Sequence, residues 1–180
     1  MASVPPSMPS PAPFIVTAEL PPDIFAWGDS LRRAHFPAER NVLSAHVTLF
    51  HSFAPSLHAE LLRTLGDFAG QFAPPDGVVE GLMNLGKGTA LAIRSPQMLA
   101  VRQRIAERFH GSLTPQDRHT PRLHITIQNK VSAEAARELQ RELAGFSPRA
   151  FRFTGLGLHI YRVTHWEGQG TWSFRGKDHA

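Results

Sequence analysis

The chain has 180 residues, 42% hydrophobic and 19% charged, which is enough length and apolar content for a folded domain with a substantial core. It contains no cysteine, which excludes a disulfide framework, thiolate catalysis and a sulfur-ligated zinc site. The formal net charge of +4, with the 10 histidines counted as neutral, suits a polyanionic substrate but is also common on ordinary basic surfaces.

No apolar run approaches the roughly 18 residues that a membrane span requires. The first 13 residues lack the basic start and apolar stretch of a secretory signal, and their repeated prolines cannot make the hydrogen bonds of helices and strands. We therefore expect a disordered tail over residues 1–13, and a cytoplasmic protein with no membrane partner.

Apolar periodicity in the first half predicts two strands that alternate with two helices. A β-branched, apolar run predicts a strand over residues 14–20, and the two prolines that follow open a helix that runs to about residue 36 with Trp27 in the core. A second strand is expected over 45–50. A second amphipathic helix follows over 57–72, where two further prolines stop it.

The second half begins with a predicted hairpin and then repeats the alternation of helix and strand. The expected segments are strands over 78–85 and 89–94, a helix over 98–109, a strand over 123–130, a helix over 132–145, and strands over 150–161 and 171–174. We expect a turn that contains Gly168 and Gly170 between the last two strands.

Two of the expected strands carry the same pattern of histidine, aliphatic, threonine, aliphatic. Because successive side chains of a strand point to opposite faces, each histidine shares a face with its threonine while the two aliphatic side chains face the core. One copy lies in each half of the chain: His46-Val47-Thr48-Leu49 and His124-Ile125-Thr126-Ile127.

Two imidazoles and two hydroxyls arranged in this way can hold a phosphodiester between two acid–base groups. One neutral histidine accepts a proton from the attacking water or hydroxyl, and the other, protonated, donates a proton to the leaving oxygen. The hydroxyls of Thr48 and Thr126 can donate hydrogen bonds to the non-bridging oxygens. This scheme needs no metal or other cofactor, and it leaves open whether His46 or His124 is the acid.

Strand alternation extends the candidate site beyond the two motifs. Gln128 and Lys130 share a face with His124 if the strand stays regular, so Lys130 could contact phosphate. Phe50 shares a face with His46 and could stack on a base, with core packing as an equal alternative.

The remaining histidines and the C-terminal aromatic residues are weaker candidates. Tyr161 can stack on substrate, although packing is the more common role of an aromatic side chain there. His51 points away from the motif face and is excluded. Four further histidines are expected to be surface or capping residues: His110, His119, His159 and His165.

The order of elements predicts an α+β protein in which each half contributes one motif strand followed by one helix. We expect a single bilobal domain over residues 14–176, with antiparallel sheets around a central cleft, helices on the outside and a short tail over 177–180. The domain is expected to be monomeric.

Together these features resemble the two-histidine (2H) phosphoesterase superfamily, in particular its bacterial 2′-5′ RNA ligase-like members. The likeness covers roughly residues 14–176. It rests on the two His-x-Thr-x motifs, on Ala45 and Phe50 around the first, on Gln128-Asn129-Lys130 after the second, and on a C-terminal Leu-x-Leu-x-x-Tyr stretch that ends in Tyr161 with Trp172 after it.

The resemblance implies a bilobal fold and metal-independent chemistry on RNA-type phosphodiesters. Members open 2′,3′-cyclic phosphates or make and break 2′-5′ linkages, so the implied partner is RNA or a nucleotide with one of these groups. Carried over by motif, His46 and His124 are the catalytic pair and Thr48 and Thr126 bind phosphate. Many relatives have arginine or small residues where this chain has Gln128-Asn129-Lys130, which leaves the choice of substrate open.

Two alternatives to a phosphoesterase remain. One is a non-catalytic RNA- or nucleotide-binding module that keeps the cleft. The other is a histidine-rich metal protein, which would need carboxylate ligands that the sequence does not place near the motifs.

Overall fold

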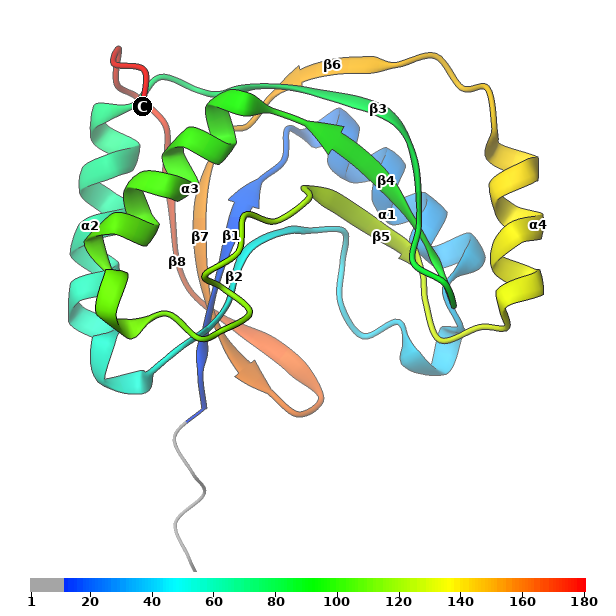
Figure 1. The fold of residues 1–180 in the computed structure, drawn as a ribbon, viewed down its shortest axis with the longest axis horizontal. Coiled ribbons are helices and arrows are strands. Elements are labelled where there is room, and N and C mark those ends of the chain that lie inside the picture. Colours follow the sequence, from blue (N-terminus) through cyan, green and yellow to red (C-terminus); the bar gives the residue numbers. More distant parts are fainter. Residues whose placement is uncertain (1–11) are drawn as a thin grey trace, which may run out of the picture.

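Residues 12–180, which the computed structural model describes, form two four-stranded sheets and four α-helices (Figure 1). The strand order is β2-β1-β7-β8 in the first sheet and β5-β4-β3-β6 in the second, and neighbouring strands are antiparallel throughout. The predicted α+β fold class is therefore confirmed. The strands are β1 (Phe14–Glu19), β2 (Val47–Phe53), β3 (Asp76–Asn84), β4 (Thr89–Arg94), β5 (His124–Gln128), β6 (Arg149–Arg152), β7 (Gly155–Arg162) and β8 (His165–Ser173), and the helices are α1 (Pro22–His35), α2 (His58–Gln71), α3 (Pro96–Arg108) and α4 (Ala133–Leu143).

Two helices connect the two sheets, since α1 crosses from the first sheet to the second and α3 lies between the second sheet and α2. α1 follows β1 of the first sheet but packs against β5 of the second, beside which α4 covers β3 and β4. α3 follows β4 of the second sheet, contacts β3 of that sheet and also lies next to α2, which covers β7 and β8 (Figure 1). Gly28 permits the close approach of α1, because a Cβ at that position would lie 3.3 Å from the side chain of Ile125. The two halves therefore interlock, and the position of each motif strand depends on both.

The aliphatic positions of both motifs belong to the hydrophobic core, as the alternation predicts. Val47, Leu49, Ile125 and Ile127 are all completely buried. Trp27 of α1 packs against the same core, again as predicted.

The strand predicted over residues 150–161 is wrong, because the chain crosses from one sheet to the other within it. β6 pairs with β3 in the second sheet, whereas β7 pairs with β1 in the first. Phe153, at the crossing, is completely buried. Since apolar side chains continue through the crossing, the hydrophobic pattern of the sequence does not reveal the break.

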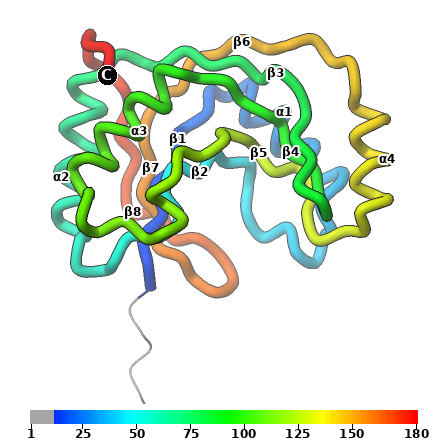
Figure 2. The backbone as a smooth tube through the Cα atoms, in the orientation of Figure 1, coloured from blue at the N-terminus to red at the C-terminus, as the bar shows by residue number. Residues whose placement is uncertain are grey.

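The turn predicted around Gly168 and Gly170 is also displaced. β7 and β8 are joined by a tight turn at residues 163–164, and both glycines lie inside β8, where its pairing with β7 shifts register. Glycine inside a strand commonly marks such an irregularity rather than a turn. The result is a long hairpin that projects beyond the rest of the first sheet (Figure 2).

The structure describes the expected C-terminal tail but little of the expected N-terminal one. The N-terminal one lies outside the described residues except for 12 and 13, and the carbonyl of Pro13 accepts a hydrogen bond from the Tyr161 amide. In the C-terminal one, Asp178 pairs with Phe72 at the end of α2, so residues 177–180 are not a free tail. No helix within residues 12–180 is long and apolar enough to cross a bilayer.

Candidate active site

The two motif histidines are held in the same way by their own backbones. His46 lies immediately before β2, and its Nδ1 is 2.8 Å from the carbonyl oxygen of Ser44. His124 begins β5, and its Nδ1 is 2.7 Å from the carbonyl oxygen of Arg122. Since a carbonyl oxygen only accepts hydrogen bonds, Nδ1 carries the proton in each neutral ring. Both rings therefore keep Nε2 as the nitrogen that can exchange protons with a substrate.

The structure brings the two motifs together at the junction of the sheets. β2 and β5 are each an edge strand, and these two edges lie next to each other. The hydroxyl-bearing positions Thr48 and Thr126 are half-buried, and neither hydroxyl makes a side-chain hydrogen bond to any residue in 12–180. Two Nε2 atoms and two hydroxyls are thus available at one junction, as the repeated motif predicts.

The environment of His46 favours its neutral form. Burial is the largest influence and lowers its pKa from the usual 6.5 to about 4, while the Ser44 carbonyl opposes this shift. The positive charge of Arg32 and the neighbouring imidazoles of His159 and His124 lower the pKa further. His46 is consequently a proton acceptor at neutral pH in the free protein.

This shift predicts a loss of stability in mild acid. An unfolded chain binds a proton at His46 near the usual pKa of 6.5, whereas the folded chain binds it only near 4. The stabilisation is therefore complete above about pH 6.5 and is lost as the pH falls toward 4, by up to about 3 kcal/mol. NMR titration of the imidazole signals should place His46 near 4, and urea unfolding of His46→Gln should depend less on pH over this range than that of the parent. A His46 signal that titrates between 6 and 7 would contradict the shift.

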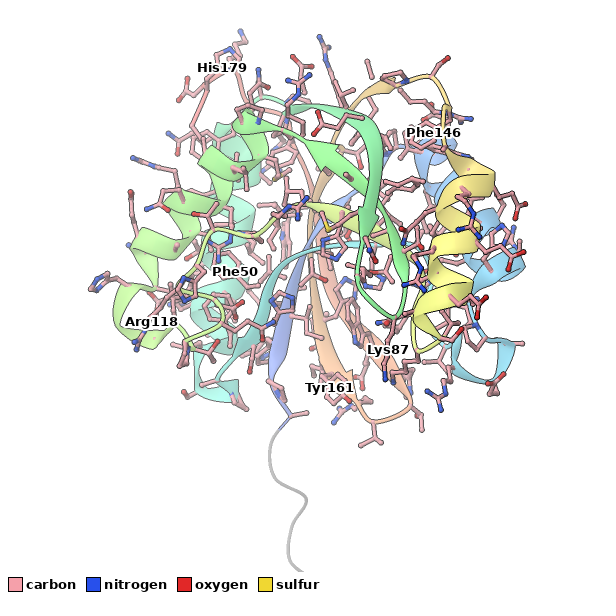
Figure 3. All side chains as sticks on the ribbon, turned by 45° about the vertical axis from the view of Figure 1, so that its right-hand side comes forward. Phe50, Lys87, Arg118, Phe146, Tyr161 and His179 are labelled. Atoms are coloured by element: carbon pink, nitrogen blue, oxygen red, sulfur yellow. The ribbon has the colours of Figure 1, made fainter. Side chains whose placement is uncertain are left out.

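The motif strands become irregular at the last residue of each motif, which overturns the site predicted for Phe50. Thr48 pairs with Thr17 of β1, but Phe50 pairs with Val16, so β2 contains one more residue than β1 at this point. The extra residue reverses the alternation and turns Phe50, labelled in Figure 3, into the core. Its side chain is completely buried, with the Arg102 guanidinium 4.4 Å from the ring centroid. Phe50 is a core residue and not a stacking platform.

The same irregularity in β5 affects the prediction for Gln128. Thr126 pairs with Ala90 and Gln128 with Thr89, which again leaves one extra residue in the motif strand. The Gln128 side chain is only 6% exposed and accepts a hydrogen bond of 3.1 Å from the Thr89 hydroxyl. It supports the packing of the second sheet instead of facing substrate.

Lys130 lies beyond the end of β5, so the alternation that placed it beside His124 does not reach it. Its backbone has a φ of 58°, in the left-handed region, and its side chain is exposed. Tyr161 lies near the end of the projecting hairpin and is 44% exposed (Figure 3). A role for Tyr161 in substrate binding stays a prediction.

Several polar residues that the sequence did not single out lie next to His46. His159, expected to be a surface or capping residue, is half-buried and has its Nε2 3.0 Å from the hydroxyl of Thr17. Trp166 packs against both imidazoles, with ring centroids 4.5 Å from His46 and 5.6 Å from His159. Burial lowers the pKa of His159, and the Glu19 carboxylate opposes that shift. The sequence contains one indication of this position: His159 alternates with the apolar residues of its strand and so lies on the opposite face from them.

A buried arginine of α1 connects the two motifs. Arg32 is 3% exposed and donates hydrogen bonds to the carbonyl of Leu43, ahead of His46, at 3.1 Å and to the carbonyl of Thr126 at 2.7 Å. One turn earlier, Asp29 accepts a hydrogen bond of 3.0 Å from the amide of Ala45. Two neighbouring side chains of α1, those of Asp29 and Arg32, therefore hold both the segment before His46 and the strand that carries His124.

Arg102 of α3 has a comparable position on the other side of the junction. It is 2% exposed and donates to the carbonyl of Leu49 at 3.0 Å and to the carbonyl of Asp117 at 2.6 Å. The buried Asp117 carboxylate in turn accepts hydrogen bonds from the backbone amides of His51 and Ser52 and from the His51 ring. Asp117 thereby fixes the exposed His51 ring, whereas the alternation from which its exclusion was predicted is reversed at this point by the extra residue in β2.

No group of three or more histidine, aspartate or glutamate side chains within residues 12–180 is arranged to hold a metal ion.

Comparisons with known proteins identify the family from the sequence and similar folds among solved structures. A family model described as the 2′-5′ RNA ligase superfamily matches residues 20–165. Similar solved structures include TT0787 of Thermus thermophilus (TM-score 0.63, 11% identity, covering 91% of this chain and 98% of that one) and a phosphoesterase (TM-score 0.59, 14% identity, 92% and 99%). A third is LigT of E. coli complexed with 3′-AMP (TM-score 0.56, 18% identity, 92% and 99%). No curated protein matches the chain.

Proposed function

Because the chain belongs to the 2′-5′ RNA ligase superfamily, we propose that it is a metal-independent phosphoesterase that opens 2′,3′-cyclic phosphates, with formation or cleavage of 2′-5′ bonds as the related reaction. The observation that carries this proposal is the matched arrangement of His46 and His124, each bonded through Nδ1 to a backbone carbonyl with Nε2 free. Structures of E. coli LigT with 3′-AMP and with NADP⁺ share this fold, so nucleotides are the ligand class to test first.

Two histidines in this arrangement can divide the proton transfers of ring opening between them. A water oxygen attacks the phosphorus of the cyclic phosphate, and its proton moves to Nε2 of His46, which the low pKa of that imidazole keeps neutral. The bond from phosphorus to one ribose oxygen breaks, and that oxygen takes a proton from Nε2 of His124. The hydroxyls of Thr48 and Thr126 donate to the non-bridging oxygens as negative charge develops there. If a ribose 5′-hydroxyl attacks in place of water, the same proton transfers join two strands.

The test of this function is hydrolysis of nucleoside 2′,3′-cyclic phosphates in the presence of EDTA. We expect turnover that EDTA does not reduce, and a bell-shaped pH profile, since one imidazole must be neutral and the other protonated. The acid limb of kcat/KM should reflect the free protein and fall near the His46 pKa of about 4. Activity that requires an added metal would contradict the mechanism, and binding of 3′-nucleotides without turnover of any cyclic phosphate would identify a binding module instead.

A further inference from the structure

A cavity of about 270 Å³ lies beside His46, between β1, the segment that leads into β2 and the β7–β8 hairpin. This volume is near the lower end of small-molecule pockets, about 300 Å³, so it suits a single ring system rather than a longer segment of RNA. The His46 side chain forms part of its wall. A chemical group bound in the cavity would therefore lie next to the phosphate that reacts at His46.

The polar side of the cavity is a chain of three hydrogen-bonded side chains. Thr17 is 2% exposed, and its hydroxyl lies 3.0 Å from both Glu19 Oε1 and His159 Nε2. A carboxylate only accepts hydrogen bonds, so the Thr17 hydroxyl donates to Glu19 and accepts from His159. The second oxygen of the carboxylate, Glu19 Oε2, has no hydrogen-bond partner within residues 12–180. The cavity thus has an acceptor without a partner on its polar side.

Gly157 makes room for this chain on the adjacent strand β7. A Cβ at that position would collide with Glu19 Oε1 and lie 2.6 Å from the Thr17 hydroxyl and 3.1 Å from His159 Nε2. Any larger residue would displace the carboxylate, because real Cβ atoms do not approach other atoms so closely. The arrangement of Glu19 toward the cavity therefore depends on a position without a side chain.

The remaining walls are partly open to solvent and combine apolar side chains with those of Ser44, His46 and His165. Trp166 lines the cavity opposite β1. Phe25 and Val42 also line it while being 39% and 60% exposed, and they are two of the four large hydrophobic side chains that are exposed in residues 12–180. Apolar walls around an unpartnered acceptor match a flat heterocycle that has apolar faces and a hydrogen-bond donor on its edge.

We propose that this cavity binds the nucleobase of the reacting nucleotide, and that the Glu19 carboxylate accepts a hydrogen bond from the exocyclic amino group of that base. The inference rests on the proposed function, because it assigns the base of the same substrate. A carboxylate pairs with the N4 amino group of cytosine but repels the O4 carbonyl of uracil. The site is therefore selective for bases that carry an amino group over uracil, whose one donor on this edge, N3–H, lies between two carbonyl oxygens that the carboxylate repels.

The experiment compares cytidine and uridine 2′,3′-cyclic phosphates. These substrates are nearly equal in size, but cytosine has an amino group where uracil has a carbonyl, at C4 of the base. The parent protein should have a kcat/KM at least about tenfold higher for the cytidine substrate, as expected for a hydrogen bond to a charged acceptor. In Glu19→Gln the amide can also donate to a carbonyl, so the ratio should fall close to one. Glu134→Gln, an exposed position on α4 away from the cavity, is the matched control and should keep the parent ratio.

Calorimetric titration of the same variants with 3′-CMP and 3′-UMP separates this inference from the proposed function. Equal kcat/KM values for both substrates in the parent, or a ratio that Glu19→Gln leaves unchanged, would overturn the nucleobase assignment while leaving the phosphoesterase activity in place. A tenfold preference for 3′-CMP that Glu19→Gln abolishes, without any turnover of cyclic phosphates, would support the base site and overturn the catalytic proposal.

Discussion

Replacement of His46 or His124 with alanine should each lower kcat for opening a 2′,3′-cyclic phosphate by about 10³-fold, the usual contribution of a positioned general acid or base. The two imidazoles act in the same step, since one takes a proton while the other gives one. The double variant should therefore be only slightly slower than either single variant, because residues that act as a unit give strongly non-additive effects. Single-turnover measurements with saturating protein would report the chemical step directly.

The control for these variants is His119→Ala, which removes an exposed histidine outside the motifs. It should retain parent activity. All three single variants should unfold cooperatively, because the aliphatic residues of the motifs, and not the histidines, form the core. A His46 or His124 variant that is folded and within about tenfold of the parent rate would rule out the division of labour between the two imidazoles.

The second large effect is expected for Arg32→Met, which keeps much of the side-chain volume and removes the guanidinium. The buried acceptors that lose a donor are the carbonyls of Leu43 and Thr126 and the side-chain oxygen of Asn41. Leaving these acceptors without partners should cost about 3 kcal/mol of unfolding free energy, measured by urea denaturation. Because Arg32 ties the segment before His46 to the strand of His124, kcat should fall more than KM rises.

The pKa of His46 distinguishes this positioning role from simple destabilisation. The positive charge of Arg32 contributes to the low pKa of His46, so that pKa should rise in Arg32→Met. Arg102→Met is the matched control, since Arg102 is similarly buried and donates to one carbonyl of β2 and one of the segment between α3 and β5, but does not influence His46. It should lower stability similarly and leave the His46 titration unchanged. Parent-like stability and an unshifted His46 pKa in Arg32→Met would contradict the proposed connection.

Local patterns in the sequence were sufficient for the order of the four helices and for most of the strands, and they singled out the four motif residues as candidates. Helices and strands follow from apolar spacing over a few neighbours, and the start of α4 follows from Ser132, whose hydroxyl accepts a hydrogen bond from the Ala135 amide. The aliphatic positions of both motifs are buried because the two-residue alternation of a strand is an intrinsic property of the extended backbone. Family and α+β class followed from the same short-range information.

Predictions that extended the alternation past the motifs failed for a physical reason. One extra residue in each motif strand reverses which side chains face the core, so Phe50 and Gln128 are buried. Whether a strand gains such a residue depends on the strand that pairs with it, here β1 and β4, and not on its own residues. The crossing at Phe153 escaped detection for a related reason, because apolar residues recur at alternate positions through it while the pairing partner changes.

The amino-acid sequence by itself determined that two histidines and two threonines would be presented on two strands, one in each half of the chain, since that depends only on local backbone geometry. Tertiary structure decided what surrounds them. It brought the edge strands β2 and β5 together, buried His46 so that its pKa falls to about 4, and assembled Thr17, Glu19 and His159 into one chain of hydrogen bonds. These contacts join residues up to 142 positions apart. Their formation depends on sheet register and helix packing, which no local pattern encodes.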